Sequence, residues 1–123
     1  MAIVQTLNLN LIPDGSTPVI YVSQADYYGR QLKCYLYFNG APYQFVKATT
    51  SFKLRGIRPD GVKLETILNK YQNQYVYTNL SDDFTEVAGD VYCNIEMIEN
   101  ETDRTGSQAF IIRVKPEAKG VIE

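Results

Sequence analysis

The stretch QLKCYLYF, residues 31–38, alternates apolar side chains with polar or tyrosine side chains without a break. A period of two residues is typical of a half-buried β-strand, because successive side chains point to opposite faces of a sheet. The stretch therefore predicts a strand with one face in the protein core. Its core face comprises Leu32, Cys34, Leu36 and Phe38, and its outward face comprises Gln31, Lys33, Tyr35 and Tyr37.

The same alternation recurs on both sides of this strand. Segments rich in Gly, Pro, Asn and Asp separate the strands and predict turns at 13–18, 39–42 and 58–61. VKLETILNKY, residues 62–71, fits either a strand or a helical turn. The predicted strands are 3–12, 19–24, 31–38, 51–57, 74–80, 90–99 and 108–116.

About seven or eight strands without a long helix predict an all-β fold, an antiparallel β-sandwich of immunoglobulin-like or jelly-roll type. A small β-barrel is the competing closure. The chain has 123 residues, which is the size of one domain. We expect the sandwich to span residues 1–115 and residues 116–123 to begin a linker to a downstream region.

The composition disfavours several classes of function. The chain has no histidine and a formal net charge of −2. The most usual general base and the commonest metal ligand are therefore missing. We expect no enzyme, no cofactor and no metal site, and the small net charge predicts no binding to nucleic acid. No apolar run is long enough to span a bilayer, so membrane insertion is not expected.

The two cysteines, Cys34 and Cys93, allow two interpretations. Their wide spacing is similar to that of the disulfide in immunoglobulin domains. However, Tyr92 lies one residue before Cys93, whereas the tyrosine of the immunoglobulin corner lies two residues before its cysteine. We expect two reduced thiols in the core, where cysteine packs as a small hydrophobe.

Charge is unevenly distributed along the chain. Residues 47–70 carry six basic and two acidic residues, whereas residues 82–103 carry eight acidic residues and no basic one. One interpretation is a docking surface with complementary charge for a partner. The other is that neighbouring strands pair these charges across an exposed face. The basic residues expected to face outward on or after the 51–57 strand are Lys53, Arg55 and Arg58.

Tyrosine is abundant, with ten in the chain. Tyr35 and Tyr37 point outward on the clearest strand and, with Tyr43, could form a platform for sugars or a contact site for a protein. Burial under neighbouring loops is the alternative. The absence of tryptophan weakens the sugar-binding interpretation.

Taken in order, four segments resemble the N-terminal domain of the upper baseplate proteins of tailed phages that infect Gram-positive bacteria. The resemblance spans nearly the whole chain, although each motif alone is mainly turn chemistry between strands. The segments are YVSQADYYGRQLKCYLYFNGAPYQF at 21–45, SFKLRGIRPDG at 51–61, VAGDVYCNIEMIE at 87–99 and SQAFIIRVKPEAKG at 107–120.

This resemblance implies a non-catalytic virion protein, made in the bacterial host cytoplasm and built into the tail baseplate. Its sandwich would attach to the distal tail protein, which forms the hub, and to neighbouring baseplate subunits. A downstream, oligomeric region would contact the receptor-binding protein. In that setting we expect Lys53, Arg55 and Arg58 to contribute to hub or subunit contacts.

Two rival functions come from other classes. The first is a carbohydrate-binding sandwich that recognises a cell-surface glycan through its tyrosines. The second is an extracellular immunoglobulin-like adhesion module, which a disulfide between Cys34 and Cys93 would favour.

Overall fold

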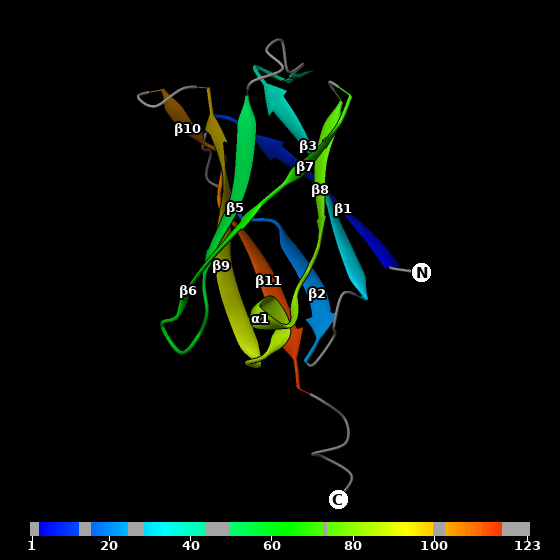
Figure 1. Ribbon diagram of the computed structural model, residues 1–123, viewed down its shortest axis with the longest axis vertical. Helices are drawn as coiled ribbons and strands as arrows, with labels where there is room; N and C mark the ends of the chain where they lie inside the picture. The colour runs from blue at the N-terminus through cyan, green and yellow to red at the C-terminus, as the bar shows by residue number, and fades with distance from the viewer. Residues whose placement is uncertain are drawn as a thin grey trace, which may run out of the picture.

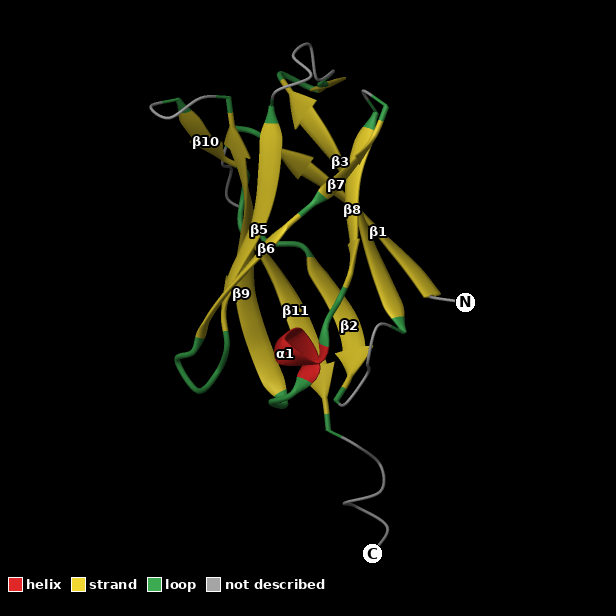
Figure 2. Ribbon diagram, viewed as in Figure 1, coloured by secondary structure: helices red, strands yellow, loops and turns green. Residues whose placement is uncertain are grey.

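The computed structural model describes residues 3–12, 16–24, 29–43, 50–72, 74–99 and 103–116, and in these ranges two β-sheets pack face to face (Figures 1 and 2). Sheet A contains β1 (Ile3–Asn10), β3 (Arg30–Phe38), β4 (Ala41–Pro42), β7 (Asn69–Tyr71) and β8 (Tyr75–Asn79). Sheet B contains β2 (Val19–Ser23), β5 (Ser51–Ile57), β6 (Lys63–Ile67), β9 (Gly89–Ile98), β10 (Arg104–Gly106) and β11 (Phe110–Lys115).

The strand order confirms the predicted all-β sandwich but shows that both sheets are mixed. Sheet A runs β1-β3-β8-β7 with β4 beside β3, and sheet B runs β2-β11-β9-β5-β6 with β10 beside β9. Two pairings, β1 with β3 and β2 with β11, are parallel, and the other pairings among the described strands are antiparallel. Side-chain alternation reports which residues face the core, but it does not report the direction of the neighbouring strand.

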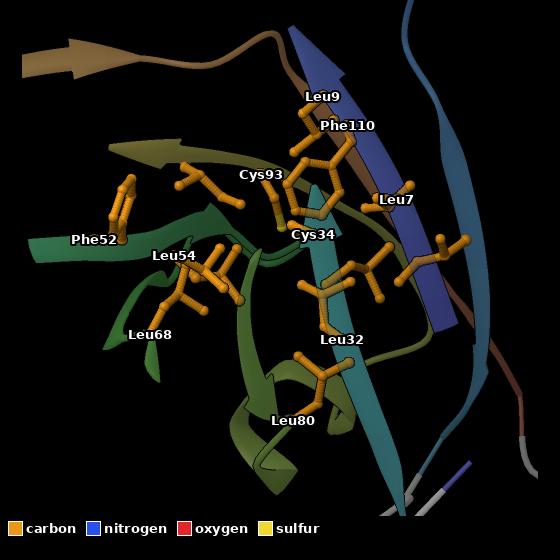
Figure 3. Close-up of a cluster of buried hydrophobic side chains, with 14 of the residues drawn as sticks. Leu7, Leu9, Leu32, Cys34, Phe52, Leu54, Leu68, Leu80, Cys93 and Phe110 are labelled. Carbon is orange, nitrogen blue, oxygen red and sulfur yellow. The ribbon is translucent and has the colours of Figure 1, made fainter. Parts of the chain in front are cut away.

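The core lies between the sheets and is filled by side chains that the alternation assigned to it (Figure 3). Phe38 is the exception: it was expected in the core but is 46% exposed, because β3 ends there and the chain turns into β4. Phe52 and Phe110 are completely buried and come from sheet B, while Leu9 and Leu32 reach the same core from sheet A. Burying such side chains stabilises the fold by about 1.5–3 kcal/mol each. The remaining core residues include Leu7, Cys34, Leu36, Leu54, Leu68, Val76, Leu80, Val91, Cys93, Ile95 and Ile112.

Both cysteines lie in this core as free thiols. Burial raises the pKa of Cys34, and it raises the pKa of Cys93 to about 12. A thiol with a raised pKa stays protonated at neutral pH and reacts poorly. The arrangement agrees with the expectation of reduced thiols and differs from the disulfide of immunoglobulin domains.

The ambiguous segment 62–71 is extended, and it passes from one sheet to the other. β6 pairs with β5 in sheet B, and β7 pairs with β8 in sheet A. Between them Leu68 is buried, and its N–H donates to the carbonyl of Phe52 at 2.9 Å. The helical alternative for this segment was wrong. Figure 1 shows β6 and β7 as one ribbon that crosses the side of the sandwich.

Short elements account for the larger number of strands. β4, β7 and β10 have two or three residues each, too few to give a periodic signal. A short helix, α1 (Asp82–Thr85), follows β8, and the Ser81 side chain makes no capping hydrogen bond. The predicted linker, apart from Pro116, lies outside the described residues.

Candidate functional site

The predicted site residues lie on opposite faces of the sandwich. Lys53 and Arg55 point outward from β5 in sheet B, and Arg58 follows in the turn to β6. Tyr35 and Tyr37 point outward from β3 in sheet A. We call the outward side of sheet B the charged face and the outward side of sheet A the tyrosine face. A single flat contact cannot include both groups.

Ion pairs run across four strands of the charged face. The Lys53 ammonium donates to Glu65 on β6 at 3.0 Å, and Arg55 donates to Glu96 on β9 at 2.9 Å. Glu96 also accepts from Arg104 on β10 at 3.3 Å. Lys53 and Arg55 of the basic block are thus paired with acidic residues of neighbouring strands, as in the second of the two interpretations above.

A further ion pair joins the two strands at the other side of this face. Arg113 on β11 donates to both carboxylate oxygens of Asp90 on β9, at 2.8 and 3.1 Å. These hydrogen bonds hold the pKa of Asp90 below its usual value and raise the pKa of Arg113. Bidentate contacts of this kind fix the orientation of the guanidinium group.

Arg58 holds the β5–β6 turn against α1 and the connection that follows it. Its guanidinium donates to both carboxylate oxygens of Asp60 and, at 2.9 Å, to Glu86. The same group donates to the main-chain carbonyl of Asp83 at 3.3 Å. Only 11% of the Arg58 side chain is exposed. Its hydrogen bonds are made within the domain, so it offers little surface to a partner.

The same turn also packs closely against the start of β9. Gly89 has a φ of +125°, and a Cβ placed there would lie 2.8 Å from Cγ of Pro59. Glycine is therefore required at this position both for the backbone conformation and for the contact. The β5–β6 turn is a corner that is fixed by Pro59 and Arg58.

An apolar row crosses the charged face. Cross-strand pairing places Ile57 of β5 beside Tyr92 of β9, Tyr92 beside Ile111 of β11, and Ile111 beside Val19 of β2. Ile57 and Tyr92 are 50% and 56% exposed. They border a groove of about 670 Å³ whose other lining residues include Arg55, Leu64, Glu65 and Asn94.

The tyrosine face carries a column of rings with a lysine inside it. Tyr71 and Tyr75 stack with their planes 9° apart and their centroids 5.0 Å apart. The Lys33 ammonium lies 4.2 Å from the centre of the Tyr75 ring and 5.3 Å from that of Tyr35. Tyr77 packs against Tyr75 at a tilt, with 6.0 Å between centroids. Such ring pairs and cation–π contacts add to the stability of the sheet.

The charge of the tyrosine face is carried by Lys33. The strands of sheet A contain no aspartate or glutamate. A hydrogen bond with Tyr35 raises the pKa of Lys33, whose ammonium group is therefore charged at neutral pH. Around the column the outward residues are amides and hydroxyls, namely Thr6, Asn8, Gln31, Asn69 and Asn79.

Sequence patterns singled out Tyr35 and Tyr37 but missed the other rings. Tyr71, Tyr75 and Tyr77 are spaced so that they share one face of the β7–β8 hairpin, which was the available signal. Tyr43, which was expected in a sugar-binding platform, instead packs against the hydrophobic core. The reason is its position after the short β4, where its N–H donates to the carbonyl of Leu36.

Metal-binding clusters and membrane-spanning helices are both absent from the described residues. No group of three or more acidic, cysteine or histidine side chains in these ranges could hold a metal ion. None of the described helices has the length and apolar character needed to cross a membrane.

No protein-family model matches the chain, and no curated protein matches it in sequence. Among solved structures, the fold is similar to the N-terminal domain of phage TP901-1 ORF48, with a TM-score of 0.67 at 14% sequence identity. The match covers 90% of this chain and 99% of that domain. The two chains therefore share a sandwich fold over the full extent of the phage domain.

Proposed function

We propose that this domain is a structural component of a phage tail baseplate and attaches a receptor-binding or distal arm assembly to the tail hub. The observation that carries the proposal is the fold match to a phage domain, which includes 99% of that domain. The four sequence segments that resemble upper baseplate proteins support it independently of the fold. Both lines favour a role in assembly rather than in catalysis.

The groove on the charged face is the surface that we assign to the hub. Protein interfaces commonly combine an apolar centre with a polar rim. Here the exposed Ile57 and Tyr92 form the centre, and Arg55 lies at the rim next to its partner Glu65. Lys53 does not line the groove but donates to Glu65, which does. Arg58 has a different role in this proposal. It fixes the conformation of the β5–β6 turn and contributes to hub binding only by positioning that turn.

The remaining partners follow from the same proposal. The distal tail protein is the hub, and neighbouring baseplate subunits contact the other surfaces. A downstream region forms a homo-oligomer and contacts the receptor-binding protein. The domain is made in the bacterial host cytoplasm and ends in the virion.

Co-purification with the distal tail protein of the same genome tests the proposal. The expected result is a stable complex whose mass, measured by light scattering, shows several copies of the domain on each hub ring. If the domain stays a free monomer beside a correctly assembled hub ring, the attachment role is wrong.

A matched pair of variants tests the groove. Ile57→Lys places a charge at the apolar centre and should abolish binding to the hub. Ile67→Lys is the control, because Ile67 is also exposed on sheet B, at 69%, but does not line the groove. Equal loss of binding in both variants, or in neither, would remove the groove from the proposal.

The tyrosine face favours a second candidate function, which is binding of a neutral cell-surface glycan. Tyr71 is 45% exposed at the end of the column, and Asn69 points outward from the same strand. Sugars combine an apolar face with many hydroxyl groups, and such a surface offers partners for both. Binding to a glycan array that disappears in Tyr71→Ala and persists in Ile57→Lys would support this candidate, and an array without any signal would reject it.

A further inference from the structure

Among the residues that the structure describes, the edge of sheet A formed by β1 has backbone groups without partners. The N–H of Ile3 donates to Gly29 and that of Leu11 to Tyr37, both in the β3 direction. In a strand, alternate residues point their backbone groups to opposite sides. The N–H and C=O groups of Val4, Thr6 and Asn8 therefore point away from β3, and within the described part of the chain they have no partner.

The end of this edge is closed by one glutamine. Gln108 in the segment between β10 and β11 donates its N–H to the carbonyl of Asn10, and its side-chain oxygen accepts from the N–H of Asn10 at 2.7 Å. The side-chain amide of Gln108 also donates to the Ser16 hydroxyl at 3.0 Å. The open part of the edge thus ends before Asn10.

β1 also lacks the features that usually protect an edge strand. Edges are commonly shortened, bulged or supplied with charges or proline, because unpaired strands associate. β1 has eight residues with no charge and no proline. By contrast, β6 carries Lys63 and Glu65, and β7 has three residues. On β2, the carbonyl of Tyr21 is occupied by the side chain of Gln5 at 2.7 Å.

We propose that β1 is an interface between two copies of this chain, in which the two β1 strands pair antiparallel about a two-fold axis at Thr6. In this register Thr6 lies opposite its own copy, and Val4 lies opposite the partner's Asn8. These are the residues whose N–H and C=O groups point outward, so each pair exchanges both backbone hydrogen bonds.

The chemistry of the strand favours a second copy as the occupant. A two-fold interface places each residue beside itself or its symmetry mate, so any charge near the axis would meet a like charge. β1 contains none, and threonine pairs well with threonine across strands. Because the axis is perpendicular to the sheet, the two tyrosine faces lie on the same side, and both charged faces stay accessible to the hub.

Amide hydrogen exchange over a concentration series tests the pairing residue by residue. At low concentration Leu7 and Leu9 should exchange slowly because β3 holds them, while Val4, Thr6 and Asn8 exchange fast. As the concentration rises, sedimentation should show a dimer, and these three amides should become protected together. A protein that stays monomeric up to millimolar concentration, or a dimer in which these amides still exchange fast, would overturn the proposal.

A charge placed on the axis provides the matched variant. Thr6→Lys places two ammonium groups opposite each other across the two-fold axis and should abolish the dimer. The melting temperature measured at monomeric concentration should fall only slightly, because Thr6 is exposed but lies beside Lys33 on β3. Thr105→Lys makes the same change at an exposed site on β10 and should leave dimerisation intact. A Thr6→Lys protein that dimerises as well as Thr105→Lys would contradict the assigned register.

Discussion

The outer face of sheet B carries charges that pair with one another, whereas the outer face of sheet A carries tyrosines that surround one lysine. Both faces arise from the same alternation of side chains along β-strands. On sheet B each arginine and lysine of the Lys53–Glu65–Arg55–Glu96 ladder has an acidic neighbour on the next strand. On sheet A the rings of Tyr35 and Tyr75 replace carboxylates as the neighbours of the cation.

This difference indicates which face has contacts that depend on pH and salt. Exposed ion pairs are weak and are screened by salt, so the charged face is sensitive to pH and ionic strength. Ring stacking depends mainly on buried area and quadrupole contacts and is largely insensitive to both. The charged face also contains an apolar row, and we therefore assign protein docking to it, whereas the tyrosine face is chemically suited to a neutral ligand.

The largest expected effect concerns the corner that anchors the charged face. Gly89→Ala should lower the free energy of unfolding by about 2–4 kcal/mol, because it adds backbone strain and a contact with Pro59 that is too close. Gly61→Ala is the control, since Gly61 also has a positive φ but its Cβ would meet no atom within 4 Å. Chemical denaturation of both should show a clearly smaller loss for Gly61→Ala, and equal losses would remove the role of the Pro59 contact.

The next effect concerns the tyrosine face. Tyr75→Ala should lower the free energy of unfolding by about 1–3 kcal/mol, because it removes ring contacts with Tyr35, Tyr71 and Tyr77 together with one face of the lysine site. Tyr75→Phe keeps the ring and should cost much less. Neither loss should depend on salt, and a strong salt dependence would show that the two faces do not differ as described.

Lowering the pH should reduce the stability contributed by the ion pairs of the charged face and leave that contributed by the ring contacts of the tyrosine face unchanged. Contacts with Arg58, Lys53 and Arg113 hold the pKa values of Asp60, Glu65 and Asp90 below their usual range. Their stabilising contribution is therefore complete above the unfolded pKa of about 4 and is lost as the pH falls through the lower folded values.

Carboxyl chemical shifts measured by NMR between neutral and acid pH would check this expectation. Asp90 should titrate below the usual range in the native protein and return to that range in Arg113→Gln. An ordinary pKa for Asp90 in the native protein would show that its ion pair does not persist in solution.

The smallest effect is expected from one member of the ladder. Arg55→Ala should lower the free energy of unfolding by less than about 1 kcal/mol, since Arg55 is half exposed. Its partners Glu65 and Glu96 also keep their ion pairs with Lys53 and Arg104. Denaturation in low and high salt should show that this small difference shrinks as salt is added. A loss as large as that of Tyr75→Ala would reverse the ranking of the two faces.

The sequence predicted the inward and outward residues well, because alternation depends only on the local backbone. The strand at 31–38 and the core positions around Cys93 agree with the structure, except that Phe38, which was expected in the core, is exposed at the end of β3. The parallel neighbours of β1 and β2 could not be predicted, since strand direction depends on contacts between segments far apart in the chain. The passage of the chain from sheet B to sheet A at Leu68 could not be predicted for the same reason.

The candidate site was predicted in parts but not in its arrangement. Outward charges and tyrosines were identified, yet the partners of Arg58 and the rings beside Tyr35 depend on the register of neighbouring strands. The apolar row from Ile57 to Val19 is assembled from four strands, with one residue from each. No window along the sequence contains such a row.

The central claim, that the charged face and not the tyrosine face meets the hub, is tested most directly by side-chain footprinting of tyrosines in the complex with the distal tail protein. Tyr92 and Tyr71 serve as matched reporters because they are 56% and 45% exposed and lie on opposite faces. We predict that complex formation protects Tyr92 and leaves Tyr71 as reactive as in the free domain. Protection of Tyr71 with an unchanged Tyr92 would contradict the assignment.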